Sequence, residues 1–193
     1  MTDPLPHHIL AALEYDPLWL DLGILSPDAL LAQFAEFQTG DDPNPEHYRY
    51  RTITAFLAAQ PSLTDTLLDG ISHLLRIDPD QLMAPAVRGH FLLPHPGLTN
   101  DQFERLAALP ETQAQNPREV LRARFLRRLA AGEWTPELLD HCITRGDSVV
   151  QLALLDHPRL DRPTLSHLAT NGCNKAIRNM AAQRLRSRRF PPT

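Results

Sequence analysis

Residues 61–77, PSLTDTLLDGISHLLRI, carry the signals that decide the fold. Thr64 is a residue type favoured at a helix N-cap, and Pro61, three residues earlier, ends the preceding helix. Apolar residues then recur at helical spacing and trace one face of the segment. These positions are Leu67, Leu68, Ile71, Leu74 and Leu75. The pattern predicts an amphipathic helix that starts after Thr64.

The same arrangement occurs five times along the chain. The five cap residues are Ser26, Thr64, Thr99, Thr135 and Asp161. Three residues before each cap stands a helix-ending Gly23, Pro61, Pro96, Gly132 or Pro158. Each cap also lies between two apolar residues at the spacing of a hydrophobic staple. The staple pairs are Leu25 with Leu30, Leu63 with Leu68, Leu98 with Phe103, Trp134 with Leu139, and Leu160 with Leu165.

Between successive caps there is room for a second helix. We predict these second helices at residues 45–60, 79–93, 117–131, 148–156 and 174–187. Several follow a capping residue and a proline, which is favoured at the first helical position. Asp78 with Gln81, and Asn116 with Glu119, also fit the capping box. No stretch alternates apolar and polar residues as a half-buried strand does. The chain is predicted to be all-α, a short right-handed α-solenoid of about five stacked helix pairs.

The predicted division of the chain follows this register. Residues 1–22 form an N-terminal helical cap, and residues 188–193 form a tail. The repeats between them cover residues 23–60, 61–95, 96–131, 132–157 and 158–187. Because a helix pair exposes an apolar face until the next pair covers it, we expect the pairs to stack.

The C-terminal third resembles the leucine-rich repeat variant family. The resemblance rests on residues 152–185, with Leu152-Ala153, His157-Pro158, Leu165, Leu168-Ala169, Ile177-Arg178 and Ala181. It covers 34 of the 193 residues, slightly less than a fifth of the chain. The longer spacings nearer the N-terminus are closer to those of HEAT-like pairs. The resemblance implies a helical-repeat architecture. Some members of the family hold an iron–sulfur cluster through cysteines, but this chain lacks such a cysteine cluster, so no cofactor is expected.

Charge is distributed unevenly, although the formal net charge is only −4. Residues 1–48 hold nine Asp and Glu and no Lys or Arg, whereas six basic residues and no acidic one follow from Lys175 onward. The N-terminus lacks the basic and apolar regions of a secretory signal, and no apolar run reaches the roughly 20 residues that cross a bilayer. We expect a cytoplasmic protein with no membrane partner.

No constellation of residues indicates an enzyme or a metal site. The two cysteines, Cys142 and Cys173, are isolated, and no Cys-x-x-Cys or His-x-x-x-His motif occurs. Glycine-rich phosphate loops and nucleophile elbows are also missing. His95-Pro96 and His157-Pro158 occupy the same repeat stop, where a histidine can cover the last carbonyls of a helix. No catalytic residue, metal or cofactor is expected. Gly146 is predicted to follow a helix end, and Asp147 to cap the next helix.

Arginines on the second helices are the candidate partner-binding residues. Equivalent helices of stacked pairs lie side by side, so an arginine ladder of Arg51, Arg88, Arg122 and Arg124 could hold an acidic peptide or phosphates. Alternatively, each arginine pairs with a carboxylate of the neighbouring repeat and joins the repeats. Tyr48 and Tyr50 are candidates for an exposed contact patch beside this ladder.

We therefore expect a non-enzymatic protein-interaction module, such as an adaptor, an inhibitor or an immunity-type binder, whose partner is another protein. The alternative is a nucleic-acid-binding protein that resembles HEAT-like DNA alkylation-repair proteins. The C-terminal arginines favour this alternative, whereas the sequence pI near 6.1 and the acidic first 48 residues oppose it.

Overall fold

The computed structural model describes residues 7–187, which divide between Asn116 and Pro117 into two compact units. Helices account for 71% of the described residues, and no strand occurs among them, so the all-α prediction is confirmed. The predicted tail, and residues 1–6 of the predicted N-terminal cap, lie outside the described residues. Unit 1 ends inside the range 96–131 that the sequence register treats as one repeat. Each unit is described by itself below.

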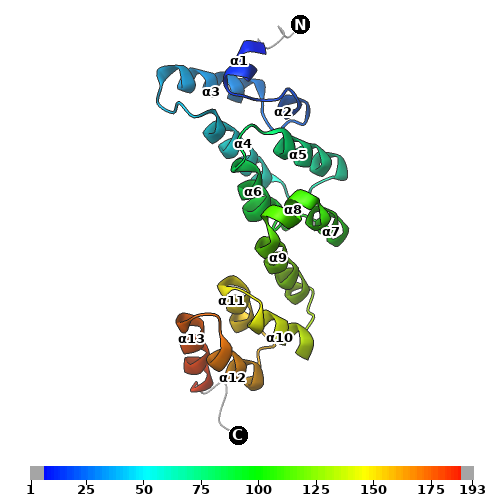
Figure 1. The fold of residues 1–193 in the computed structure, drawn as a ribbon, viewed down its shortest axis with the longest axis vertical. Helices are drawn as coiled ribbons and strands as arrows, with labels where there is room; N and C mark the ends of the chain where they lie inside the picture. Colours follow the sequence, from blue (N-terminus) through cyan, green and yellow to red (C-terminus); the bar gives the residue numbers. More distant parts are fainter. Residues whose placement is uncertain (1–6, 188–193) are drawn as a thin grey trace. The chain divides into compact units, whose positions relative to one another are not determined.

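Unit 1 begins with two short helices and continues with longer ones (blue to green in Figure 1). Its elements are α1 (His7–Ala12), α2 (Leu18–Asp21), α3 (Pro27–Thr39), α4 (Pro45–Ala59), α5 (Asp65–Ile77), α6 (Met83–Val87), the π-helix η1 (Arg88–Leu92), α7 (Asn100–Ala108) and α8 (Pro110–Gln115). Helix α4 packs on α6 and η1, while α1 packs on α3 and α2 on α5. The second helix of one predicted pair therefore contacts the second helix of the next.

The described part of unit 2, residues 117–187, contains five helices (green to red in Figure 1). They are α9 (Pro117–Ala130), α10 (Pro136–Thr144), α11 (Ser148–Asp156), α12 (Arg162–Asn171) and α13 (Lys175–Leu185). Helix α11 packs on both α9 and α13, and α10 packs on α12. Helices of the same rank in successive pairs therefore contact each other. Their apolar faces meet in one core around Phe125, Leu138, Leu154 and Leu165.

All five predicted caps are confirmed. In each case the side-chain oxygen accepts a hydrogen bond from the backbone N–H three residues later, which satisfies one of the unpaired donors at the helix start. These caps are Ser26, Thr64, Thr99, Thr135 and Asp161. Gly23 and Gly132, which end the preceding helices, have φ of 67° and 79°, a left-handed conformation that glycine adopts without steric cost.

The staple positions are buried in four of the five copies. The exception is the fourth copy, in which Trp134 and Leu139 are half-buried. There the fully buried residue is Leu138, one position earlier. The Trp134 ring instead stacks on the His157 imidazole, with ring centroids 4.3 Å apart.

Both capping boxes predicted at the second helices are wrong. The Asp78 carboxylate pairs with Arg49 and accepts the Asp80 N–H, and the next helix begins only at Met83. The Asn116 side-chain amide donates to the Pro85 carbonyl, and its oxygen has no hydrogen-bond partner in the described structure. A tertiary contact has displaced the local cap in both cases.

Three buried polar side chains join segments that the sequence register assigns to successive repeats. The Gln102 amide, besides completing a capping box with Thr99, donates to the Leu63 carbonyl of the preceding repeat at 2.9 Å. The His95 Nε2–H donates to the Leu57 carbonyl at 3.0 Å, and its Nδ1 accepts the Gly97 N–H. His95 therefore covers a carbonyl in the last turn of α4, the role predicted for it.

Gln151 performs the same function in unit 2. Its amide donates to the Ile143 carbonyl at 2.7 Å, and its oxygen accepts the Cys173 N–H at 2.8 Å. One fully buried side chain thus links the end of α10, helix α11 and the turn before α13. Such a residue fixes the register between repeats, because an unpaired buried amide would be costly.

Within residues 7–187, no helix has the length and the apolar character that crossing a bilayer requires.

Candidate interaction site

The four arginines of the predicted ladder are divided between the two units. Arg51 and Arg88 belong to unit 1, whereas Arg122 and Arg124 belong to unit 2. Arg88 is only 2% exposed, and its Nη1 donates to the Gln115 side-chain oxygen at 2.9 Å. Burial lowers the pKa of its guanidinium. The expectation that Arg88 contacts a partner is wrong, because its side chain is enclosed within unit 1.

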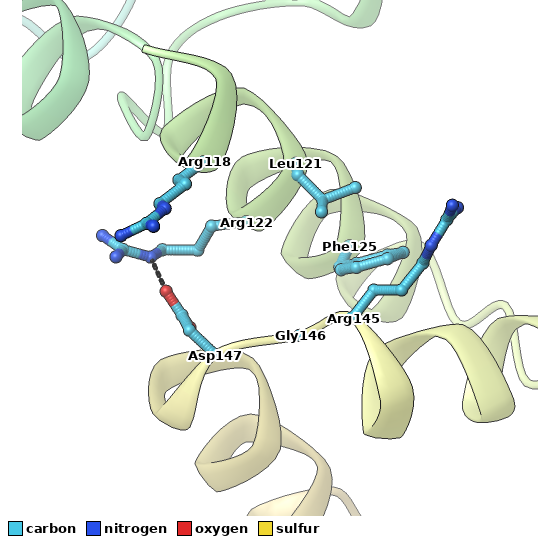
Figure 2. A pocket seen from close by; sticks show the side chains of 7 residues that line it. All are labelled: Arg118, Leu121, Arg122, Phe125, Arg145, Gly146 and Asp147. Carbon is cyan, nitrogen blue, oxygen red and sulfur yellow. Dashed lines mark hydrogen bonds and ion pairs between the residues drawn. The ribbon is translucent and has the colours of Figure 1, made fainter. Parts of the chain in front are cut away.

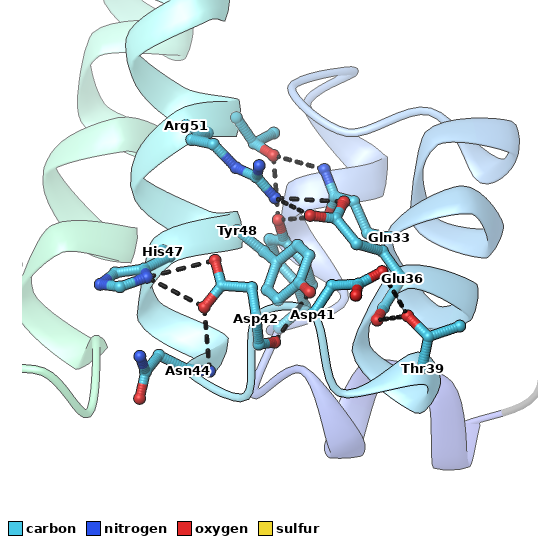
Figure 3. Close-up of polar contacts among 11 residues, drawn as sticks. Gln33, Glu36, Thr39, Asp41, Asp42, Asn44, His47, Tyr48 and Arg51 are labelled. Carbon is cyan, nitrogen blue, oxygen red and sulfur yellow. Dashed lines mark hydrogen bonds and ion pairs between the residues drawn. The ribbon is translucent and has the colours of Figure 1, made fainter.

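Arg51 is exposed but has a carboxylate partner within its own repeat (Figure 3). Its Nη2 lies 3.2 Å from a Glu36 oxygen, and its guanidinium lies over the Tyr48 ring, 4.8 Å from the centroid. This agrees with the alternative interpretation that ladder arginines pair within the fold, although Glu36 is in the same repeat, not a neighbouring one.

The expected tyrosine patch is wrong for Tyr48. Its side chain is fully buried, and its hydroxyl donates to the Asp42 carbonyl at 2.9 Å. Burial of the ring, together with the Glu36 and Asp42 carboxylates, raises the pKa of Tyr48. Tyr50 is half-buried and meets Phe91 edge to face, with centroids 5.9 Å apart. Both rings serve the packing of unit 1.

Arg122 leads to the candidate site in unit 2. Its Nε donates to the Asp147 carboxylate at 2.5 Å, joining α9 to the start of α11. Arg124 is half-buried on the same helix and does not line the pocket described next.

A pocket of about 250 Å³ opens between α9 and the turn from α10 to α11 (Figure 2). Its lining residues are Arg118, Leu121, Arg122, Phe125, Arg145, Gly146 and Asp147. Figure 2 shows Arg118 and Arg122 extending toward Asp147 at one end, and Arg145 extending past Phe125 at the other. The pocket therefore has cationic ends and an apolar middle.

Helical periodicity explains why α9 contributes four of these residues. Arg118, Leu121, Arg122 and Phe125 stand at i, i+3, i+4 and i+7, which places them on one face. On the opposite wall Gly146 allows close packing of the turn, because a Cβ there would lie 2.2 Å from the Cys142 carbonyl oxygen. The turn thus brings Arg145 and Asp147 against α9.

Asp147 caps α11, as predicted, and this role occupies its carboxylate. Its Oδ1 accepts the N–H groups of Val149 and Val150, while Oδ2 accepts from Arg122. Asp147 is the one acidic residue that lines the pocket, against three arginines. The pocket lining therefore carries a net positive charge, to which the amino end of α11 adds a partial positive charge.

Arg118 and Arg145 are exposed and have no hydrogen-bond or ion-pair partner within the described residues. Two exposed apolar side chains, Val149 and Leu152, follow shortly after on α11 and are 45% and 38% exposed. Arginine and exposed apolar side chains are both common in surfaces that bind a partner.

The sequence analysis did not select Arg118 or Arg145 as candidate binding residues. The available signal was the i, i+4 repetition of Arg118 and Arg122 on one helical face. That Arg145 lies across from this face depends on the α10–α11 turn, which spacing alone does not reveal.

The described residues contain no group of three or more His, Cys, Asp or Glu arranged to hold a metal ion. Cys142 is buried, and burial raises its pKa to about 11, whereas Cys173 is exposed. A second pocket of about 290 Å³, in unit 1, is lined by Glu14, Asp16 and Asp78 together with apolar side chains. The Glu14 and Asp78 carboxylates are already paired with Arg49.

Comparisons of the chain with family models, with curated proteins and with solved structures gave no match.

Proposed function

We propose that this chain is a non-enzymatic protein-interaction module, an adaptor, inhibitor or immunity-type binder, and that unit 2 carries its partner-binding surface. The observation that carries the proposal is a pair of exposed arginines, Arg118 and Arg145, that have no partner among residues 7–187 and lie on either side of the apolar residues Leu121 and Phe125. Arginine and aromatic residues contribute strongly to the centres of protein interfaces.

The scaffold proposed for this surface is a stack of helix pairs, with leucine-rich repeat variant or HEAT-like repeats. The contacts of α11 with α9 and α13, and of α10 with α12, support a stack within unit 2. The contact of Gln102 with the Leu63 carbonyl, and that of Gln151 with the Cys173 N–H, each link one proposed repeat to its neighbour. Such scaffolds present the outer faces of their helices and the turns between them to partners.

Binding to nucleic acid is the less favoured alternative. It relied on a ladder of available arginines, but Arg88 is buried and Arg51 faces Glu36. Arg184, at the basic end of the chain, donates to the Asp156 carboxylate at 2.7 Å. Fewer cations remain available for phosphates than the sequence suggests, and a duplex requires several of them.

The test compares two doubly charge-reversed variants of the full chain. Arg118→Glu with Arg145→Glu changes the proposed surface. Lys175→Glu with Arg186→Glu makes the same change in net charge at two exposed residues of unit 2 outside the pocket. A partner captured from the source cells by the unaltered chain is purified, and its affinity for each chain is measured by calorimetry.

We expect the pocket variant to weaken binding by at least about tenfold and the control variant by less than about threefold. Equal losses in both variants would contradict the proposal. Submicromolar binding of the unaltered chain to duplex DNA that weakens steeply with salt would also contradict it, and would establish the nucleic-acid alternative.

A further inference from the structure

We infer that the α9–α11 pocket recognises an acidic segment of the partner protein in which two carboxylate groups flank an apolar side chain. This inference rests on the proposed function and specifies its ligand. The segment places one carboxylate at Arg118, the other at Arg145, and the apolar side chain against Leu121 and Phe125.

The distribution of charge in the pocket indicates how many anionic groups the ligand carries. Asp147 already accepts from Arg122, so each end keeps one guanidinium, Arg118 or Arg145, that no group in the described part of the chain pairs with. In Figure 2 these two side chains extend from opposite ends of the pocket. Each can form a bidentate pair with one carboxylate, the geometry that a planar guanidinium favours.

A single phosphate group fits this arrangement less well. A dianion is held best by several guanidinium groups that converge on it, whereas the free cations here lie apart and the Asp147 carboxylate faces the end occupied by Arg118 and Arg122. Two separate monoanions match two separate cations, and the monoanion at the Arg118 end meets less repulsion from Asp147 than a dianion would. The charge pattern therefore favours a carboxylate-bearing peptide over a phosphorylated one.

The middle of the pocket determines what lies between the carboxylates. Leu121 and Phe125 form an apolar surface there, and the volume of about 250 Å³ is below the range typical of drug-sized ligands. A space of this size suits one large apolar side chain of a bound segment. Burial of that side chain against Phe125 also excludes water from the flanking ion pairs and strengthens them.

Repulsion between two arginines of α9 also favours an anion at the Arg118 end of the pocket. Arg118 and Arg122 stand four residues apart on one face, where like charges repel. Asp147 compensates Arg122 alone, through a direct hydrogen bond. A carboxylate at Arg118 would relieve the remaining repulsion.

The probe is a dye-labelled peptide with blocked ends whose centre reads Glu-Glu-Leu-Phe-Asp-Asp, and binding to the full chain is measured by fluorescence anisotropy. Comparison peptides replace the first acidic pair with glutamine, the second acidic pair with asparagine, or the apolar pair with serine. Protein variants are Arg118→Gln and Arg145→Gln, and Lys175→Gln with Arg186→Gln is the control. Circular dichroism and a thermal melt establish that each variant is folded.

We expect the acidic peptide to bind at low salt with a dissociation constant on the order of tens of micromolar, and more weakly as salt rises. Peptides in which one acidic pair is neutralised, or the apolar pair is replaced with serine, should bind about five- to tenfold more weakly than the acidic peptide. Each pocket variant should bind the acidic peptide more weakly by the same factor. In double-mutant cycles, the affinity of Arg118→Gln should no longer depend on whether one acidic pair of the peptide is charged. The affinity of Arg145→Gln should no longer depend on the charge of the other pair. The control variant should bind as the unaltered chain does.

Equal binding of acidic and neutral peptides would overturn the inference, as would equal coupling of both arginines to the same acidic end. Tighter binding of a phosphoserine-containing peptide of the same length, through the same arginines, would also overturn it. If no peptide binds but the purified partner is still lost on charge reversal of Arg118 and Arg145, the ligand assignment fails while the proposed function stands. If charge reversal leaves the partner bound, the proposed function itself fails.

Discussion

Arg49 is the residue whose substitution should cost unit 1 the most stability. Its side chain is 1% exposed and is held by Asp78, which is 2% exposed, through contacts of 2.9 and 3.2 Å. It also donates to the Leu13 carbonyl at 3.0 Å and pairs with Glu14. One guanidinium therefore joins α4 to the segment after α1 and to the end of α5.

Arg49→Met, which keeps an unbranched apolar side chain of similar length, should lower the free energy of unfolding by about 3–5 kcal/mol. The reason is that the Asp78 carboxylate would remain buried without a counter-charge, the usual cost of breaking a buried pair from one side. Loss of the donor to the Leu13 carbonyl contributes to the same loss. Glu14 adds little because it is 47% exposed.

The matched control is Arg51→Met on the same helix. Arg51 and its partner Glu36 are 54% and 39% exposed, so this change should cost less than about 1 kcal/mol. The double variant Arg49→Met with Asp78→Asn removes both charges. It should be more stable than Arg49→Met alone by about 1–3 kcal/mol, the range of coupling between contacting residues.

Trp19 provides the assay, because it is 2% exposed and lies in unit 1. All variants carry Trp134→Phe, which removes the tryptophan of unit 2 and leaves Trp19 fluorescence as a reporter of unit 1 in urea unfolding. A chain with two units need not unfold in one step, so a unit-specific probe is required. A loss below about 1 kcal/mol for Arg49→Met, or one equal to that of Arg51→Met, would refute the reasoning.

The same assay checks three further predictions. Leu68→Ala should cost about 2–5 kcal/mol because Leu68 is 1% exposed, and the half-buried Leu67→Ala should cost clearly less; equal losses would contradict the helix register. Gly97→Ala should cost about 1–3 kcal/mol, because its Cβ would lie 2.4 Å from the Pro61 carbonyl oxygen; an unchanged midpoint would contradict this close contact. Burial raises the pKa of Tyr15 to about 12. The neutral phenol therefore makes its full contribution to stability below about pH 10, the pKa of tyrosine in the unfolded chain. This contribution is lost as the pH rises from about 10 to about 12. Unfolding free energies across that range should fall by on the order of 2 kcal/mol more than in Tyr15→Phe, and parallel pH profiles would contradict it.

Local interactions explain why the first helix of each predicted pair could be located from the sequence. A cap residue such as Thr64 satisfies an N–H only three residues away, and the staple pair Leu63 and Leu68 lies within one helical turn. These interactions depend on neighbours in the chain. They are confirmed wherever no distant group competes, as at Thr99 and Asp161.

Errors occurred where a distant partner intervened. Asp78 before Pro79 has the form of a helix start, but its carboxylate binds Arg49, which is 29 residues away. Arg88 has a spacing similar to that of Arg51 from its repeat stop, yet it begins the π-helix η1 and is buried. A π-helical turn changes the direction in which residues face, so α-helical spacing could not show that Arg88 faces inward.

The arginines compared above lie in three kinds of environment, which differ in how readily the charge can be reached by a partner. Arg49 and Arg88 are buried and have partners, so using either for recognition would unfold what it supports. Arg51 has a surface partner that an incoming anion would have to displace. Arg118 and Arg145 have no such partner within residues 7–187 and stand beside apolar surface, so an acidic ligand there displaces only water. Availability of the charge, and not its position in the repeat, is therefore the reason for proposing the partner-binding surface in unit 2.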